Sequence, residues 1–487
     1  MTLSETVHTI GWRAFASTKL TTVTIPKSVT LMGSGAFYGC ANLTEIAVEA
    51  GNTAYKSVDG VLFTADGKTL VGYPAGKGTG YTIPTGTEVI AAEAFRWCET
   101  LTEVTIPEGV VQIAPLAFCD TLNLTSIDLP DSVVTIGSAA FGKSIGSIPT
   151  TTLAISIGTD TAWIGEQAFD GYLVTGFTVA ADNRHYSAQD AYLMNVSGTE
   201  LVRVANQLQG VATVPETVNH IGSGAFAECT GLTEVILPDS VTSMAAYADL
   251  PTLEKLTVGA GLLNWNNLKQ CAGIGQIQVS ADNPNFVMKD GVIYNADMST
   301  LLLFASQATD FTMPDTVTEV ASGAFAGAAL LKEITLSANL NTMPDGVFGN
   351  CKSLETISSP GSNLFYTAKD GLLYSKDGTK LISFPMGKTG TVKIADGTLE
   401  IARGAIYDSN YLQSEHIIFP EGLVAIREYN LQAKGYGKSL TVELPASLTD
   451  IHPNFLKYIW DSNVLVKCPE NSAAAQFAAS RNFTVEN

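Results

Sequence analysis

Apolar and polar residues recur along this chain in two short patterns that alternate from end to end. The first pattern is the hexad Ile-Gly-x-x-Ala-Phe, which occurs at residues 10–15, 32–37, 90–95, 113–118, 136–141, 164–169 and 221–226. Weaker copies lie at 320–325, 343–348 and 401–406, while Tyr247, Leu268, Leu431 and Leu456 hold the aromatic position in degraded copies. This position recurs about every 23 residues, with four intervals longer by about 35, and such a fixed period is the signature of a leucine-rich-repeat solenoid.

The second pattern, Leu-Thr-Glu-Val-Thr-Ile-Pro at residues 101–107, alternates apolar and polar side chains and ends at a proline. Such alternation predicts a short β-strand that a turn terminates. One unit cannot bury its own apolar face, so we expect neighbouring units to stack as parallel strands about 4.8 Å apart. Val104 and Ile106 then point into the core, whereas Glu103 and Thr105 point outward.

We interpret each hexad as a compact helical turn, in which the small alanine leaves room for the aromatic ring of the adjacent layer. The predicted fold is therefore a repeat solenoid. It is a right-handed leucine-rich-repeat superhelix with short parallel strands on one face and short helical turns on the other.

The four long intervals share a third pattern, an asparagine followed by an Asp-Gly or Asp-Ala pair and two apolar-alternating arms. In the first interval the arms flank Asp66-Gly67, which is a strong short-range signal for a tight β-hairpin turn. We expect hairpin insertions near residues 52–82, 183–213, 283–313 and 363–393 of a solenoid that covers residues 1–463. Residues 464–487 depart from the repeat and predict a strand followed by a helix, which we interpret as a cap over the open end of the core.

These motifs together resemble the BspA-like (type 5) leucine-rich repeats of bacterial surface proteins. They include the Ala-Phe-x-x-Cys variant of the hexad, found at residues 36–40, 94–98 and 225–229. The resemblance spans residues 8–487. It implies an extracellular or cell-surface protein, in a family whose members are implicated in adhesion to host matrix proteins or cells, and it implies no catalytic residues or cofactor. We expect that a signal peptide or an anchor was removed from a longer precursor, because repeat sequence begins almost at once.

Composition then narrows the classes of function. The chain has 27 Lys and Arg against 47 Asp and Glu, and its net charge of −20 argues against binding to nucleic acid. No apolar run reaches the length of a membrane span, so we expect no transmembrane segment. Hydrophobic residues make up 46% of the chain, which is enough for an extended core. We expect the protein to be a monomer.

Cysteine and histidine are distributed without any sign of a catalytic or metal site. Cys40, Cys98, Cys229 and Cys351 each follow the aromatic position by three residues, as Cys271 follows Leu268. A fixed place in the repeat means a fixed place in the core, so we expect buried reduced thiols and neither disulfides nor zinc. The histidines, His8, His185, His220, His416 and His452, fall in different units, and we expect no metal site and no enzyme.

Two further features could indicate ligand binding. The acidic turns at Asp59-Gly60, Asp182-Asn183, Asp282-Asn283, Asp290-Gly291 and Asp370-Gly371 suggest calcium, but they lack the alternating carboxylates of a calcium loop. We interpret them as ordinary turn residues. Trp12 and Trp97 occupy variable positions of their turns, where we expect them to be exposed.

The outward side chains of the strands give the leading hypothesis about function. Four glutamates precede the first core residue of their strands, namely Glu45, Glu103, Glu234 and Glu333, and four threonines follow it, namely Thr24, Thr105, Thr257 and Thr335. Aligned across neighbouring strands, they would form a flat acidic and hydroxyl-rich surface for a protein or glycan partner, such as host extracellular matrix or a cell surface. The alternative for these residues is a solvated face that binds nothing.

Two functions therefore remain open. The first is a non-enzymatic cell-surface or secreted binding or adhesion protein that presents an extended repeat surface. The second is a structural spacer that holds another module away from the cell surface. A contiguous aromatic or apolar patch on the strands would favour the first, and a uniformly polar face the second.

Overall fold

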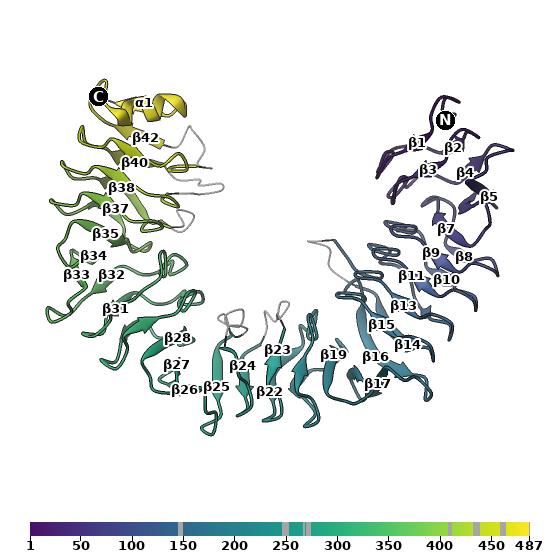
Figure 1. Cartoon of the computed structure of the whole chain (residues 1–487), viewed down its shortest axis with the longest axis horizontal. Helices are drawn as coiled ribbons and strands as arrows, with labels where there is room; N and C mark the ends of the chain where they lie inside the picture. The colour runs from purple at the N-terminus through teal and green to yellow at the C-terminus, as the bar shows by residue number, and fades with distance from the viewer. Residues whose placement is uncertain are drawn as a thin grey trace. The chain divides into compact units, whose positions relative to one another are not determined.

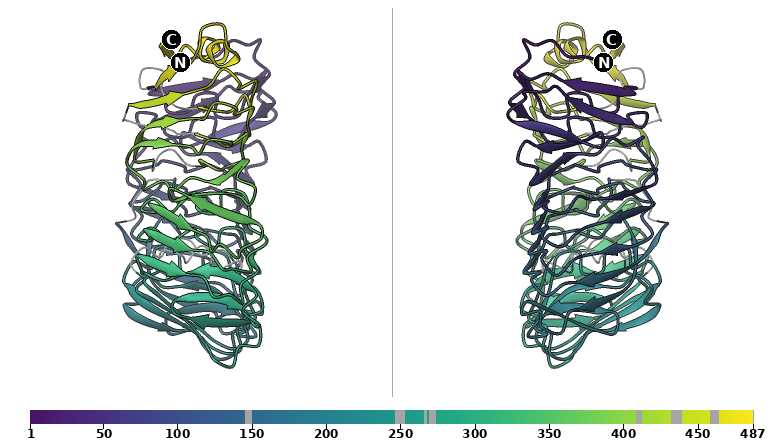
Figure 2. Two further views of the ribbon diagram at one scale, coloured as in Figure 1. Left: turned by 90° about the vertical axis from the view of Figure 1, so that its left-hand side faces the viewer. Right: turned by 90° about the vertical axis from the view of Figure 1, so that its right-hand side faces the viewer.

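The computed structural model describes residues 1–144, 150–245, 253–265, 268, 274–407, 412–431, 439–457 and 464–486. The chain divides into two compact units, Met1–Leu253 and Glu254–Asn487. Each unit is a β-solenoid of stacked coils, built almost entirely from short strands and turns (Figure 1). Side views show the strands of successive coils lying one above another within each unit (Figure 2).

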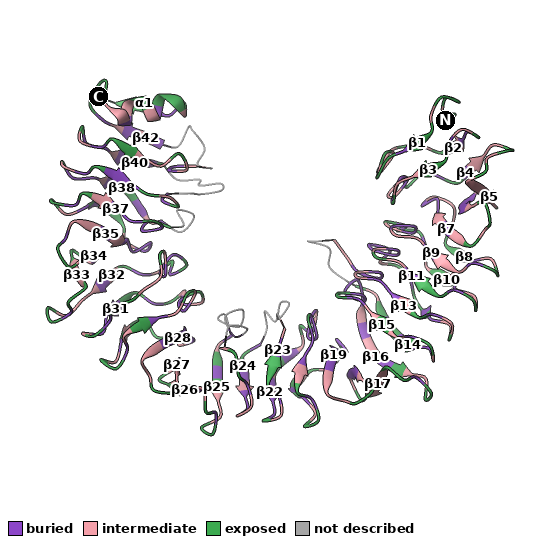
Figure 3. Ribbon diagram, in the orientation of Figure 1, coloured by how far each residue is buried: buried purple, intermediate pink, exposed green. Residues whose placement is uncertain are grey.

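The strands of the Leu-Thr-Glu-Val-Thr-Ile-Pro pattern form one side of every coil, which we call the strand face. In the first unit these are β2 (Thr22–Ile25), β4 (Glu45–Val48), β8 (Gly80–Thr82), β10 (Glu103–Thr105), β12 (Ile127–Asp128), β14 (Thr152–Ile157), β16 (Leu173–Val179), β20 (Gly210–Thr213) and β22 (Leu232–Leu237). In the second unit they are β24 (Lys255–Val258), β25 (Gln276–Val279), β29 (Asp310–Thr312), β31 (Glu333–Thr335), β32 (Thr356–Ser358), β36 (Gly390–Lys393), β38 (Ser414–Ile418), β40 (Leu440–Glu443), β42 (Val464–Lys467) and β43 (Thr484–Glu486). Their residues alternate between exposed and buried, as in Thr152–Ile157, which places one set of side chains in the core (Figure 3).

A second row of two-residue strands begins the hexads. It comprises β1 (Thr9–Ile10), β3 (Leu31–Met32), β9 (Val89–Ile90), β11 (Gln112–Ile113), β13 (Thr135–Ile136), β15 (Trp163–Ile164), β21 (His220–Ile221) and β23 (Ser243–Met244), and then β30 (Glu319–Val320), β37 (Glu400–Ile401), β39 (Ala425–Ile426) and β41 (Asp450–Ile451). Equivalent repeat positions pair in parallel, so that Ile113 lies between Ile90 and Ile136. The repeat period therefore sets the register of the stack.

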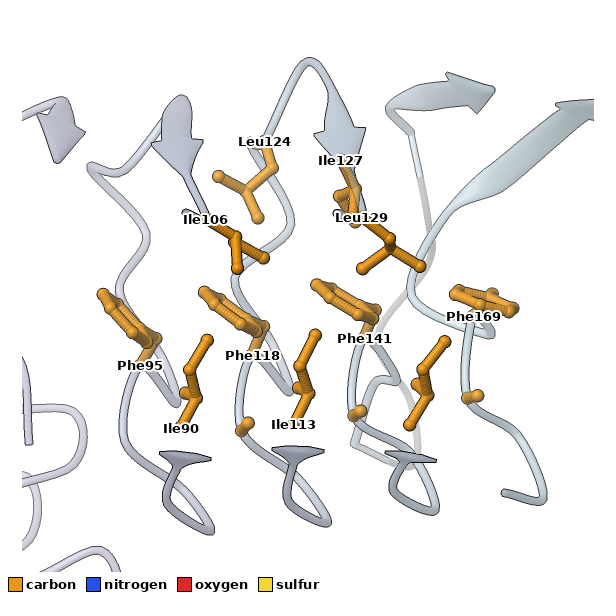
Figure 4. Packing of buried hydrophobic residues seen from close by; sticks show 14 of the residues in the cluster. Ile90, Phe95, Ile106, Ile113, Phe118, Leu124, Ile127, Leu129, Phe141 and Phe169 are labelled. Carbon is orange, nitrogen blue, oxygen red and sulfur yellow. The ribbon is translucent and has the colours of Figure 1, made fainter. Parts of the chain in front are cut away.

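The aromatic residues of the hexads stack in the core. The ring centroids of Phe95 and Phe118 lie 4.6 Å apart, those of Phe118 and Phe141 4.9 Å, and those of Phe141 and Phe169 6.0 Å (Figure 4). All four side chains are buried. The small alanine before each ring brings neighbouring backbones close, since the Phe95 amide donates to the Ala117 carbonyl at 2.7 Å and the Phe118 amide to the Ala140 carbonyl at 2.7 Å.

The helical turns expected at the hexads are not present in the described residues, where the hexads form hydrogen-bonded turns instead. The fourth residue of the hexad has a positive φ, between 49° and 76°, at Arg13, Gly35, Glu93, Leu116, Ala139, Gln167, Gly224, Gly323, Gly346 and Gly404. An α-helix needs φ of about −63° at successive residues, so one left-handed residue in each hexad interrupts it. The expectation was wrong because several of these residues, such as Leu116 and Gln167, are not glycine and give no sign of this conformation.

Each long interval contributes three strands, one more than the expected hairpin. They are β5 (Tyr55–Val58), β6 (Val61–Thr64) and β7 (Thr69–Gly72); β17 (Tyr186–Gln189), β18 (Tyr192–Asn195) and β19 (Glu200–Val204); β26 (Phe286–Lys289), β27 (Val292–Asn295) and β28 (Thr300–Phe304); β33 (Tyr366–Lys369), β34 (Leu372–Ser375) and β35 (Lys380–Ser383). The strands of each set pair antiparallel, and the third also pairs in parallel with the next second-row strand, as β7 does with β9. The insertions are thus part of the stack.

The asparagine that opens each insertion joins two coils. The Asn363 amide group donates to the carbonyls of Ser337 and Leu340 at 3.0 and 2.9 Å, and its carbonyl oxygen accepts from the amides of Phe365 and Tyr366 at 2.8 Å each. Asn52, Asn183 and Asn283 make the equivalent bonds. These residues satisfy four backbone groups and explain why asparagine recurs there.

The C-terminal segment of the second unit contains β42, β43 and the helix α1 (Ala473–Ser480). The Ser472 hydroxyl caps this helix by accepting from the Ala475 amide at 3.1 Å. Ala474 and Ala478 are buried against the last coils, together with Phe483. Among the described residues, α1 is the one α-helix, and no helix there is long and apolar enough to cross a membrane.

Candidate functional site

Exposed polar side chains line up along the strand face of the first unit. Thr105 on β10 pairs with Thr82 on β8, and Ser156 on β14 lies between Asp128 on β12 and Thr178 on β16. All five side chains are exposed. The Thr178 hydroxyl donates to the Ser156 hydroxyl at 2.9 Å, which holds two of them in a fixed geometry. We call these five residues the hydroxyl row.

The four predicted glutamates occupy equivalent places on the strand face without lying next to one another in the described strand pairs. Glu45 pairs with Thr22, Glu103 with Gly80, and Glu234 with Val211, whereas Glu333 lies between Asp310 and Thr356. Glu45, Glu103 and Glu333 are exposed, and Glu234 is half-buried. The acidic part of the predicted surface is therefore interrupted by neutral side chains.

Three of the four predicted threonines pair with polar residues on the neighbouring strand. Thr335 is half-buried between Thr312 and Ser358, and Thr257 is half-buried beside Gln278. Thr24 is half-buried and pairs with Ala47. Thr105 is the predicted residue that belongs to the hydroxyl row.

Another threonine position was missed in the sequence. The Thr102 hydroxyl donates to the Thr79 carbonyl at 3.0 Å, and the Thr125 hydroxyl donates to the Thr102 carbonyl at 3.1 Å. Thr44 makes the same bond to Thr21 at 3.1 Å. The recurring Leu-Thr pair was the available signal. These hydroxyls bind backbone and so contribute to the stacking of coils.

The last strands of the strand face in the second unit carry paired charges. His416 Nε2 lies 2.9 Å from Glu443 Oε1, and Lys467 Nζ lies 3.3 Å from Glu486 Oε2. A shallow hollow of about 370 Å³ is lined by Lys393, Glu443 and Lys467 with the turns that follow their strands. Single-sequence patterning did not reveal this pairing, since it depends on the register of β36, β38, β40 and β42.

Trp12 and Trp97 are 64% and 40% exposed, which confirms the expectation for both. Their indole N–H groups are nevertheless held by buried carboxylates. Trp12 Nε1 donates to Glu93 at 3.2 Å, and Trp97 Nε1 donates to Asp120 at 2.7 Å. The exposed indole faces are thus fixed in position by residues that are 5% exposed.

Glu93 is the centre of a cluster of charges and rings in the first unit. It accepts from Arg13 Nε at 3.0 Å and from Arg96 Nη1 at 2.9 Å. Burial acts to raise the pKa of Glu93, but hydrogen bonds from Arg96, Arg13 and Trp12 together hold it below its usual value. The Arg13 guanidinium also lies 4.1 Å from the Trp12 ring centroid and 5.0 Å from that of Tyr38.

The cysteines at the repeat position are buried free thiols, as expected, at Cys40, Cys98, Cys229 and Cys351. Cys271 lies outside the described residues, as does Tyr247. Burial raises the pKa of the Cys229 and Cys351 thiols to about 12. Cys119 and Cys468, which have other places in the repeat, are buried free thiols as well.

Asn183 and Asn283 of the acidic turns are buried and bond to backbone, as described for the insertions. Within the described ranges, no group of three or more His, Cys, Asp or Glu side chains is arranged to hold a metal ion.

Stacked parallel coils with a buried aromatic ladder and a repeated polar strand face define a leucine-rich-repeat β-solenoid. The chain matches the BspA type leucine-rich repeat region, in 6 copies, over residues 1–59, 77–187, 207–281 and 302–389. It belongs to this family, which confirms the resemblance seen in its motifs. A comparison with curated proteins finds no match.

Several solved structures are similar to this chain. A leucine-rich cell surface protein from Faecalibacterium prausnitzii is 24% identical, with a TM-score of 0.41, over 73% of this chain and 83% of that one. A leucine-rich repeat protein from Bacteroides ovatus is 17% identical, with a TM-score of 0.29, over 92% of each chain. The pneumococcal vaccine antigen PcpA is 14% identical, with a TM-score of 0.28, over 99% of this chain and 85% of that one.

Proposed function

We propose that this chain is a non-enzymatic cell-surface or secreted binding protein that presents its strand face to a protein or glycan partner. The observation that carries this proposal is the hydroxyl row, in which Thr82, Thr105, Asp128, Ser156 and Thr178 are exposed in successive coils. Paired strands lie about 4.8 Å apart, so Thr82 with Thr105, and Asp128 with Ser156 and Thr178, offer donors and acceptors at that spacing. A partner with repeated hydroxyl or amide groups, such as a glycan or an extended peptide, could bind along it.

The wider surface of this proposal includes Glu45, Glu103, Thr105, Glu234, Thr257, Glu333 and Thr335. Thr105 is its most favourable member, because its strand partner Thr82 is also exposed and polar. The net charge of −20 favours a partner that is neutral or basic over one that is acidic. Membership of the BspA-type family supports an extracellular or cell-surface location and a role in adhesion, for which host matrix is one candidate partner.

Two observations favour the alternative, a structural spacer. The Thr102 and Thr125 hydroxyls bind backbone carbonyls and are thereby committed to holding coils together. A polar strand face can therefore be explained in part by stacking alone. The described strand face of the first unit also has no aromatic cluster of the kind that marks many interfaces.

A binding screen distinguishes the two functions. The purified chain is tested on arrays of glycans and of extracellular matrix proteins, together with a variant that carries Thr105→Arg and Ser156→Arg. The matched control carries Gln112→Arg and Thr135→Arg, on the second strand row of the same unit. We expect a partner that the control retains and the strand-face variant loses. The absence of any partner would favour the spacer, whereas a partner that both variants retain would place binding outside the strand face.

Three further expectations remain part of the proposal. They are a right-handed coil, a monomer, and the division into a repeat body of residues 1–463 and a cap of residues 464–487. Scattering and sedimentation of the purified chain would test the oligomeric state.

A further inference from the structure

A cavity of about 330 Å³ lies on the hexad side of the first unit, at the second insertion. It is lined by the hexads at 164–169 and 221–226 and by residues of β18 and β19. Its polar lining includes Glu166, Gln167, Glu200, Arg203, His220 and Ser223. The volume is in the range of small-molecule sites, which span about 300–1,000 Å³.

Arg203 is the unusual residue of this lining. It is 5% exposed, and its Nη1 donates to the Asp170 carboxylate and to the Gly224 carbonyl, the latter at 3.2 Å. Its Nε and Nη2 atoms are buried and have no hydrogen-bond partner in the part of the chain that the structure describes. A buried guanidinium with two unpaired nitrogen atoms is unfavourable, and an acceptor from a bound molecule would remove that penalty.

The other insertions show that this arrangement is particular to the second one. Arg203 replaces Gly72, Leu303 and Ser383 at the equivalent place, while Val204 replaces the rings of Tyr73, Phe304 and Phe384. In the first insertion, the matching cavity between the hexads at 32–37 and 90–95 has a volume of only about 10 Å³. There the fourth residue of the later hexad is Glu93, whereas here it is Gly224.

We propose that this cavity binds a small zwitterion of the α-amino acid class, with its carboxylate on Arg203 and its ammonium group toward the carboxylates of Glu200 and Glu166. This site is separate from the strand face and does not depend on the function proposed for it.

The chemistry of the lining supports this class of ligand. The Nε–H and Nη2–H groups of a guanidinium lie side by side and match the two oxygens of a carboxylate. Asp170 already balances the charge of Arg203, and Glu166 and Glu200 add negative charge to the same cavity. An anion alone would be repelled by these two glutamates, whereas an ammonium group on the ligand offsets them.

Calorimetry with the purified full chain tests the proposal. The probes are alanine, phenylalanine and glutamate, each compared with the acid that lacks the amino group, namely propionate, 3-phenylpropionate and glutarate. We expect at least one amino acid to bind, and the matching acid without the amino group to bind more weakly.

Arg203→Lys keeps a positive charge beside Asp170 but removes the bidentate hydrogen-bond donor for the ligand carboxylate. It should weaken binding by about tenfold to a hundredfold. Ser223→Trp places a bulky group at an exposed position of the cavity lining and should also abolish binding, without touching the buried ion pair. Glu200→Gln should weaken binding of the amino acid. Binding of the matching acid without an amino group should stay the same or become tighter. The matched control is Arg427→Lys, an arginine of the second unit paired with Glu400 and Asp450.

The melting temperature of each variant shows whether it folds. If Arg203→Lys does not fold, Ser223→Trp still tests whether the cavity is the binding site. Binding that is weakened in Arg203→Lys, lost in Ser223→Trp and retained by Arg427→Lys would support the site. The proposal is overturned if no amino acid of the panel binds to the folded wild-type chain, if binding survives Ser223→Trp, or if the acids without an amino group bind equally well.

Discussion

The ring of Phe118 lies between two others, with its centroid 4.6 Å from that of Phe95 and the two planes only 11° apart. On its other side the Phe141 ring is 4.9 Å away. Each ring therefore belongs to the cores of two neighbouring coils at once. Stability in such a stack depends on contacts between neighbours, and it should respond locally to damage.

Replacement of Phe118 by alanine should lower the free energy of unfolding by about 3–5 kcal/mol, because it opens a cavity and removes two ring contacts. Hydrogen exchange should show lost protection in the coils next to Phe118 and little change in the second unit. Phe365→Ala is the control, since Phe365 is 51% exposed and should tolerate the change. Equal loss of protection throughout the chain would contradict this local view of stability.

Asn363→Ala should destabilise the second unit by about 2–4 kcal/mol, because four backbone groups lose their partner in a buried place. Chemical denaturation monitored by circular dichroism measures the effect. Asn350→Ala, at an exposed position of the same unit, should change stability little. Equal effects of the two substitutions would argue against the structural role of the first asparagine.

The buried thiols should resist alkylation in the folded chain at pH 8 and react once it unfolds. Burial raises the pKa of Cys229 and Cys351 to about 12 from an unfolded value of 9.0. A raised folded pKa gives stability that is complete below the unfolded pKa and is lost as pH rises above it. The free energy of unfolding should therefore fall above pH 9. Buried tyrosines such as Tyr73, whose pKa is also raised by burial, lower it in the same direction.

Mass spectrometry after native alkylation tests the first part, and denaturation at pH 8 and at pH 10 tests the second. Rapid labelling of Cys229 or Cys351 in the folded chain would show that these thiols are accessible.

Glu93→Gln should destabilise the first unit at neutral pH, because it removes the charge that pairs with Arg13 and Arg96. The folded pKa of Glu93 lies below its ordinary value of 4.5, so its contribution is present above that value and is lost as pH falls. The difference in stability between wild type and variant should thus shrink in acid. Glu99→Gln, at an exposed site, provides the control. A difference that stays constant from neutral pH to below pH 4 would exclude a role for the Glu93 charge.

The repeat period was sufficient to predict the stacked strands, the aromatic core and the family, because register follows directly from spacing. The conformation of the hexads could not be predicted in this way. Glycine marks the left-handed position at Gly35 and Gly224, but Glu93 and Gln167 adopt the same conformation without any sign in their identity. The hexad is also too short to show a hydrophobic period that would separate a helical turn from another kind of turn.

The Arg203 cavity could not be predicted from the sequence either, because its lining residues are far apart in the chain. Arg203 lies in a strand that otherwise alternates normally, and its partner Asp170 is far away in the chain. Only the pairing of β19 with β21 brings Arg203 against the hexad turns. The hydroxyl row was partly predictable, since Thr105 was selected by its place in the strand pattern, but its neighbours Asp128 and Ser156 required the register.

The left-handed residue of each hexad has a consequence for protein engineering. Successive coils hold this place with residues as different as Arg13, Leu116 and Gly224, so the backbone there does not dictate the side chain. A library that varies Leu116, Ala139 and Gln167 together, while keeping the buried Ala-Phe pairs, would diversify partly exposed side chains on three neighbouring coils of the first unit. Substitution by β-branched residues is the exception, since a positive φ is strongly unfavourable for them. The same turn that breaks the helix thus makes the coil a candidate framework for designed binding reagents.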